Sequence, residues 1–189
     1  MKHAIALFAT VALALMVSPS WAESPREEAE KLAQPGAGHV ALKALLGKWK
    51  CVTTTALTMK DGKPLTFGGT VERTSILGDR YVRESYAGKG PTGQPYSGVG
   101  YLGYDNDGQV YQGVWMTTFN THMVQYAGKL SGSMFTFHGK EAGASGASKS
   151  KRFVMTLEMK SPQEHVLTQY YLNADKSRTK SFSTVYSRP

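Results

Sequence analysis

From Lys48 onward the chain alternates between short stretches rich in Thr, Val, Tyr, Phe and Ser and gaps marked by Gly, Asp and Asn. Stretches of this composition are typical of β-strands, and the residues in the gaps are those that turns favour. The pattern predicts ten strands, over residues 48–59, 67–76, 80–87, 97–104, 109–117, 121–129, 133–139, 151–159, 164–173 and 179–187.

Most of the predicted connections between these strands are short. Short connections favour antiparallel neighbours, and closing such a meander removes its exposed edges. We therefore predict a mostly β fold, a single antiparallel up-and-down β-barrel of about ten strands. An open sandwich of two sheets is the alternative. Two connections exceed hairpin length, at 88–95 and 139–150, and the second is small, polar and rich in glycine.

Ahead of the strands, the spacing of apolar residues changes to that of a helix. Residues 23–34 are charged and favour a short helix, which the Pro35-Gly36 pair ends. Residues 39–46 place three leucines on one helical face and stop at Gly47. This second segment predicts a small apolar plug that leads directly into the first strand.

The first 22 residues have the parts of a secretory signal peptide: a cationic start, an apolar run over 4–17, and small residues at Ser20 and Ala22. The run is shorter than the roughly 20 residues that a helix needs to cross a bilayer. We expect cleavage between Ala22 and Glu23, no transmembrane anchor afterwards, and a periplasmic or secreted protein. An uncleaved anchor is the alternative, which Pro19 disfavours.

Removing the signal peptide leaves 167 of the 189 residues, which suits one domain. We divide the chain into a signal peptide (1–22), a helical or linker segment (23–37) and a β-barrel domain (38–189). Cys51 is the only cysteine, so no intramolecular disulfide can form, although export leads to an oxidising compartment. Trp49 and Cys51 lie two apart in a predicted strand and share one face, which favours burial of both.

The chain is basic: 22 Lys and Arg against 14 Asp and Glu give a net charge of +8, and removing Lys2 with the signal peptide leaves +7. In a cytoplasmic protein this charge would favour nucleic acid as a partner, but export removes that partner. The remaining interpretations are electrostatic contact with an anionic envelope surface and a solvated basic surface. We favour the solvated surface.

Aromatic, basic and imidazole side chains recur in the predicted strands. Because alternate residues of a barrel strand point inward, some of these side chains could line a pocket for a small apolar or amphipathic ligand. The alternation does not say which face is the interior. The candidate ligand-binding residues are Arg83, Tyr101, Trp115, His122, His138 and Tyr170.

None of the common catalytic or cofactor motifs occurs in the sequence, so we predict no catalytic residue, no metal ligand and no cofactor. An enzyme is the alternative to a binding protein, a hydrolase or isomerase with His122 or His138 as base and Arg83 stabilising an anion. Haem ligation by one of the mature chain's four histidines (His39, His122, His138, His165) and a structural or stress-related role at the envelope are further alternatives.

Three segments together resemble the bacterial family DUF1579: GHVALKALLGKWK at 38–50, GGTVERTSILGDRYVRESYAG at 68–88 and SGVGYLGYDNDGQVYQGVW at 97–115. Within the first, Gly-Lys-Trp also resembles the Gly-x-Trp that closes one end of lipocalin-type barrels. The resemblance implies a calycin-type barrel of unknown function and brings no catalytic residues. Family members tend to place an acidic residue two positions beyond the residue matching Trp115, whereas this chain has Thr117.

Overall fold

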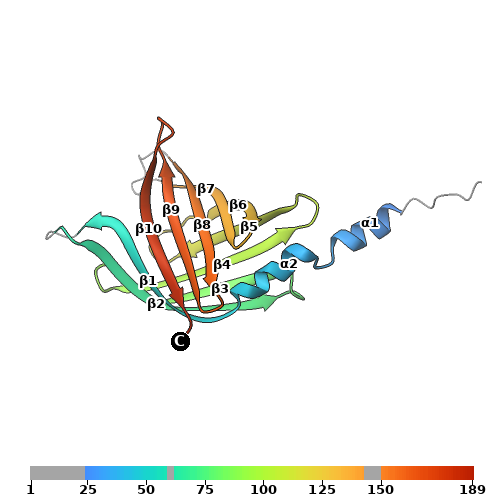
Figure 1. The fold of residues 1–189 in the computed structure, drawn as a ribbon, viewed down its shortest axis with the longest axis horizontal. Helices are drawn as coiled ribbons and strands as arrows, with labels where there is room; N and C mark the ends of the chain where they lie inside the picture. The colour runs from blue at the N-terminus through green and yellow to red at the C-terminus, as the bar shows by residue number, and fades with distance from the viewer. Residues whose placement is uncertain (1–23, 59–61, 143–149) are drawn as a thin grey trace, which may run out of the picture.

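The computed structural model describes residues 24–58, 62–142 and 150–189, so the expected signal peptide lies outside the described residues. Ten strands form a closed antiparallel barrel in which each strand pairs with the next one in sequence and β1 pairs with β10 (Figure 1). The strands are β1 Gly47–Thr58, β2 Pro64–Ile76, β3 Tyr81–Lys89, β4 Pro95–Asp105, β5 Val110–Thr117, β6 Val124–Ser131, β7 Met134–Glu141, β8 Lys151–Ser161, β9 Glu164–Leu172 and β10 Arg178–Ser187. The predicted barrel and its ten strands are confirmed, and the open sandwich is wrong.

The two long connections expected from the sequence have different outcomes. The first is shorter than predicted, because β3 continues to Lys89 and β4 begins at Pro95. The backbone N–H of Gly90 donates to the carbonyl of Gln94 at 2.8 Å, which closes this link as a hairpin. Of the second connection, residues 143–149 lie outside the described residues.

The first helix, α1 (Pro25–Leu32), has no buried residue and extends away from the barrel (Figure 1). Its start follows from the sequence. The Ser24 hydroxyl accepts from the Glu27 backbone N–H at 3.3 Å, and the Glu27 carboxylate accepts from the Ser24 N–H at 2.8 Å. This reciprocal cap, with Pro25 at the first helical position, stabilises the helix without tertiary packing.

The second helical segment closes one end of the barrel, as predicted. It consists of α2 (Ala37–Leu42) and the 3₁₀ helix η1 (Lys43–Leu45). The side chains of Leu42 and Leu45 are buried against Trp49, whose indole N–H donates to the Leu45 carbonyl at 3.0 Å. We call this the closed end of the barrel and the opposite end the open end.

Trp49 is held between two side chains from the C-terminal part of the chain. Its ring lies 4.2 Å from the His165 ring, and the Arg188 guanidinium lies 3.8 Å from the indole centroid. Gly47, two residues earlier, has φ of 108°, and a Cβ there would lie 2.1 Å from Arg188 Nη1. The glycine is therefore required for both its backbone conformation and the close approach of Arg188.

Candidate ligand-binding site

The pairing of the strands decides which side chains point into the barrel. Buried Trp49 and Cys51 set the inward face of β1, and their cross-strand partners continue this face into β2 and onward around the sheet. In the half of the barrel nearer the closed end, the inward side chains of residues such as Trp49, Val71 and Phe135 are fully buried. We call this part the closed half. It forms a solid core.

Several inward side chains nearer the open end keep part of their surface exposed, although Phe153 and Tyr86 are only 1% and 8% exposed. Leu167 shows this most clearly, because it is half-buried although its partners Leu157 and Thr184 are only 4% and 5% exposed. We call the part of the barrel nearer the open end the open half. Other half-buried inward side chains in it are Phe67, Tyr96, Trp115, Val124, Tyr126 and Phe182.

Glycines on the inner wall let aromatic rings lie flat against it. The indole of Trp115 lies over Gly98 and Gly100, where a Cβ would come within 2.3 and 2.6 Å of the ring. Tyr126 covers Gly113 in the same way, with a Cβ approach of 2.4 Å. Rings that lie along the wall occupy less of the space near the barrel axis than rings that point across it. The open half therefore presents flat aromatic faces to its interior.

A charged pair joins β2 and β3 on the inner wall. Arg73 Nε donates to Glu84 Oε2 at 2.6 Å, and the two side chains are 3% and 23% exposed. The guanidinium lies 4.4 Å from the Tyr186 ring centroid, and its Nη1 has no hydrogen-bond partner among the described residues. Burial acts to lower the pKa of Arg73, but the attraction of Glu84 and Tyr186 outweighs burial and raises that pKa. Arg73 therefore stays charged beneath the more accessible Glu84.

Four tyrosines surround this pair on the inner wall. Burial raises the pKa of Tyr86 to about 12 and also raises those of Tyr96, Tyr126 and Tyr186. A hydrogen bond with Trp115 acts on Tyr96 in the opposite direction. The Tyr86 hydroxyl is buried and has no partner within the described residues. All four phenols are protonated at neutral pH and can donate hydrogen bonds.

His165 and Cys51 belong to the closed half. His165 is almost fully buried against Trp49, and burial, together with Arg73 and Arg188, lowers the pKa of its imidazole to about 4. Cys51 is buried as expected, and burial raises the pKa of its thiol. Both side chains are therefore uncharged at neutral pH. The sequence offered no signal that selected His165 over the other histidines.

The structure places the predicted site residues on two different faces. Trp115 lies on the inner wall, whereas Arg83 and Tyr101 pair with each other on the outer wall, beside the buried inward residues Val82 and Leu102. Tyr170 is half-buried and also lies on the outer wall. The interior pocket that the sequence suggested around Arg83 therefore does not contain this residue.

His122 and His138 are not brought together. The strand expected from residue 121 begins at Val124, so His122 lies in the preceding loop, half-buried. His138 is exposed on the outer wall of β7, where it pairs with Ala127 and Val154. A catalytic role for either imidazole stays a prediction without a described partner group.

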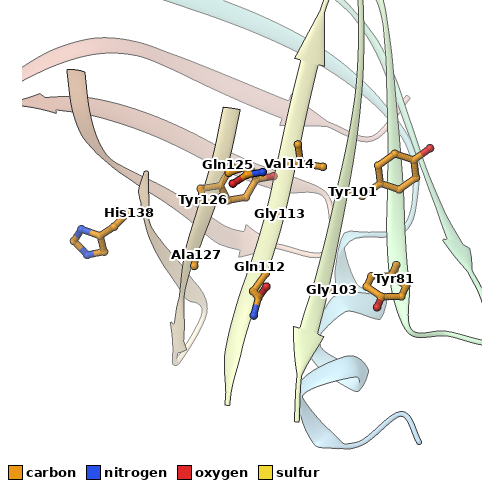
Figure 2. A pocket seen from close by; sticks show the side chains of 10 residues that line it. All are labelled: Tyr81, Tyr101, Gly103, Gln112, Gly113, Val114, Gln125, Tyr126, Ala127 and His138. Atoms are coloured by element: carbon orange, nitrogen blue, oxygen red, sulfur yellow. The ribbon is translucent and has the colours of Figure 1, made fainter. Parts of the chain in front are cut away.

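Tyr101 and His138 instead line a groove of about 560 Å³ on the outer wall (Figure 2). Figure 2 shows the rings of Tyr81 and Tyr101 on one side of this groove and His138 on the other, with Gln112 between them. A second hollow of about 450 Å³ shares His138 and adds basic side chains from β7 and β8, those of Lys140 and Arg152. The hollows on the outer wall are thus lined by tyrosines at one end and by the basic side chains of Lys140 and Arg152 at the other.

The part of the chain that the structure describes contains no helix long and apolar enough to cross a membrane. Within the same residues, no three side chains of His, Cys, Asp or Glu gather as a metal site. Of the candidate haem ligands, His39 uses its Nδ1 to accept from the Gly36 N–H at 3.0 Å, and His165 is packed into the closed half. Haem ligation stays a prediction that an absorption spectrum after haem addition would test.

A closed antiparallel barrel with one plugged end is of the lipocalin-like, calycin type. The chain belongs to DUF1579, a family described as a protein of unknown function, whose model matches residues 34–188. The crystal structure of Rv2717c from M. tuberculosis is similar at a TM-score of 0.54 and 13% identity, over 82% of this chain and 99% of that chain. A de novo designed fluorescence-activating β-barrel matches at a TM-score of 0.44 and 16% identity, over 79% and 97% of the two chains. Identities this low concern the fold alone, and no curated protein matches the chain.

Proposed function

We propose that this protein binds a small apolar or amphipathic molecule against the inner wall of the open half. One observation carries the proposal: the inward side chains of Leu167, Trp115 and Tyr126 remain partly exposed, whereas those of Trp49, Val71 and Phe135 are fully buried. Covering about 100 Å² of such apolar surface contributes about 2.5 kcal/mol to binding, before the entropic cost of association.

The inner wall also holds the polar groups that such a site needs. Small-ligand sites combine apolar walls with a few polar groups that fix the ligand's orientation. Here the accessible carboxylate of Glu84 can accept a hydrogen bond, and the protonated phenols of Tyr96 and Tyr126 can donate one. A molecule with an apolar body and one polar end fits this combination.

A fluorescence titration with N-phenyl-1-naphthylamine, a neutral apolar probe, tests the proposal. We expect saturable binding of one probe per chain, weakened about tenfold by Trp115→Ala, which removes a large part of the flat wall. Tyr81→Ala is the matched control, because it removes an exposed ring from the outer wall. No saturable binding, or equal losses in the two variants, would contradict a site on the inner wall.

We further propose that the protein is exported, which rests on the composition of its first 22 residues. Cell fractionation followed by N-terminal sequencing tests this. A mature chain beginning at Glu23 outside the cytoplasm is expected. A full-length chain found in the cytoplasm would contradict export.

A further inference from the structure

The Arg73–Glu84 pair presents its acidic member to the barrel interior. Arg73 is 3% exposed and Glu84 23%, and one hydrogen bond, from Nε to Oε2, joins them. Within the described residues, no hydrogen bond reaches the other carboxylate oxygen, Oε1. On the far side of Glu84 from Arg73 lies Gly100, over which the Trp115 indole lies. With 23% of the Glu84 side chain exposed, Oε1 is left without a partner among the described residues of the inner wall.

Aromatic faces lie beside this carboxylate. The Trp115 indole lies flat over Gly100, the cross-strand neighbour of Glu84, so that its ring spans β4 toward β3. Next along the inner face of β3 is Tyr86, whose ring lies 4.8 Å from that of Tyr96. The faces of aromatic rings carry negative electrostatic potential and attract cations, by about 0.5 to 2 kcal/mol for each contact.

The positive member of the pair is shielded from the interior. The guanidinium of Arg73 lies over the Tyr186 ring and 5.9 Å from that of Trp49. An anionic ligand would have to displace Glu84 to reach it, and would meet a carboxylate and aromatic faces first. A cationic group meets a carboxylate oxygen without a partner in the described part of the chain, and the same aromatic faces, first.

We propose that the ligand of the open half carries an ammonium group, which donates a hydrogen bond to Glu84 Oε1 and packs against Trp115. This inference rests on the proposed function and names the chemical class of molecule that the inner wall accepts. The apolar body of the ligand lies along the aromatic wall toward the open end. The arrangement makes Glu84 the residue that determines specificity for charge.

Three probes that share a naphthalene ring and differ in charge test the proposal by calorimetric titration at neutral pH: 1-naphthylmethylamine, 1-naphthalenemethanol and 1-naphthoate. We expect the amine to bind about tenfold more tightly than the alcohol, because a charge-assisted hydrogen bond and a cation–π contact add to the same ring burial. The carboxylate is expected to bind most weakly of the three.

Glu84→Gln removes the charge and keeps the shape of the side chain, so the amine should lose its advantage over the alcohol. This variant leaves the buried Arg73 without a counter-charge and can fail to fold. The double variant Arg73→Met with Glu84→Gln removes both charges and keeps the test available. Glu72→Gln is the matched control, because Glu72 is exposed on the outer face of β2 and should leave all three affinities unchanged.

The results separate this inference from the function on which it rests. Equal affinities of the amine and the alcohol for the wild-type protein, or an amine preference that survives the double substitution, overturn the ammonium inference and leave the binding function standing. If none of the three probes binds, the proposed function itself is overturned, and the inference with it.

Discussion

The closed and open halves of the barrel are built from the same ten strands but use their inward residues differently. In the closed half, Leu42, Leu45 and Trp49 form a solid core with Arg188 packed over it. In the open half, inward rings such as that of Trp115 lie flat on glycines and stay partly exposed. The closed half can hold the fold together, which leaves the open half for the proposed ligand.

The largest expected effect compares the two inward tryptophans. Trp49→Ala should lower the free energy of unfolding by about 3 to 5 kcal/mol, because it opens a cavity in a buried core. Trp115→Ala should cost about 1 to 2 kcal/mol, since its ring is partly exposed. Urea denaturation of both variants measures the difference. Equal losses would mean that the open half contributes to the core as the closed half does.

The closed half should also weaken in acid through His165. The pKa of His165 falls from 6.5 to about 4 on folding, so the unfolded chain binds more protons between these values. Its contribution is fully present above pH 6.5 and is lost as the pH falls toward 4, at a total of about 3 kcal/mol.

Unfolding measured in urea at neutral pH and near pH 4 checks this dependence. The variant His165→Gln should lose less stability between the two pH values than the wild type loses. The control, His138→Gln, changes an exposed imidazole of the outer wall and should follow the wild type. If His165→Gln loses as much stability between the two pH values as the wild type, His165 does not cause the weakening in acid.

A smaller effect concerns the glycine that admits Arg188. Gly47→Ala should cost about 1 to 3 kcal/mol, because a Cβ meets Arg188 in a strained backbone conformation. Gly132 also has positive φ, of 57°, but a Cβ there would meet nothing within 4 Å, so Gly132→Ala should cost about 1 kcal/mol or less. Thermal unfolding of the two variants separates the destabilisation caused by the contact with Arg188 from that caused by placing an alanine at positive φ. Similar melting temperatures would show that the Arg188 contact matters little.

The smallest effect is expected on the outer wall. Tyr101→Ala and His138→Ala remove lining residues of the groove in Figure 2 and should change the affinity for N-phenyl-1-naphthylamine by less than about twofold. Their positions face away from the barrel interior. A loss of about tenfold in either variant would move the ligand from the inner wall to the outer groove.

The barrel could be predicted from the sequence because alternation and turn residues are local signals. Which face of each strand points into the barrel could not be predicted from the sequence. Alternation shows that two sets of residues lie on opposite faces, but only the pairing of the strands relates each set to the buried Trp49 and Cys51. Arg83 and His138 were candidates on residue type alone, and pairing places them outside. Glu84, one residue from Arg83, points inward for the same reason.

The Arg73–Glu84 pair could not be predicted for a related reason. Arg73 and Glu84 lie eleven residues apart in the sequence, in two strands whose polar residues alternate as in many other strands. Only the pairing of β2 with β3 brings the two side chains together. Arg188 reaches Trp49 because closure of the barrel brings β10 beside β1. Contacts that depend on closure leave no local pattern in the sequence.

The most direct test of the inner-wall site places one tryptophan on either side of the same strand. Leu167→Trp adds a large side chain to the inner wall of the barrel, whereas Val166→Trp adds the same side chain on the outer face of β9. Titration with N-phenyl-1-naphthylamine should show an affinity lowered about tenfold by Leu167→Trp and unchanged by Val166→Trp. Equal affinities of the two variants would contradict binding in the open half.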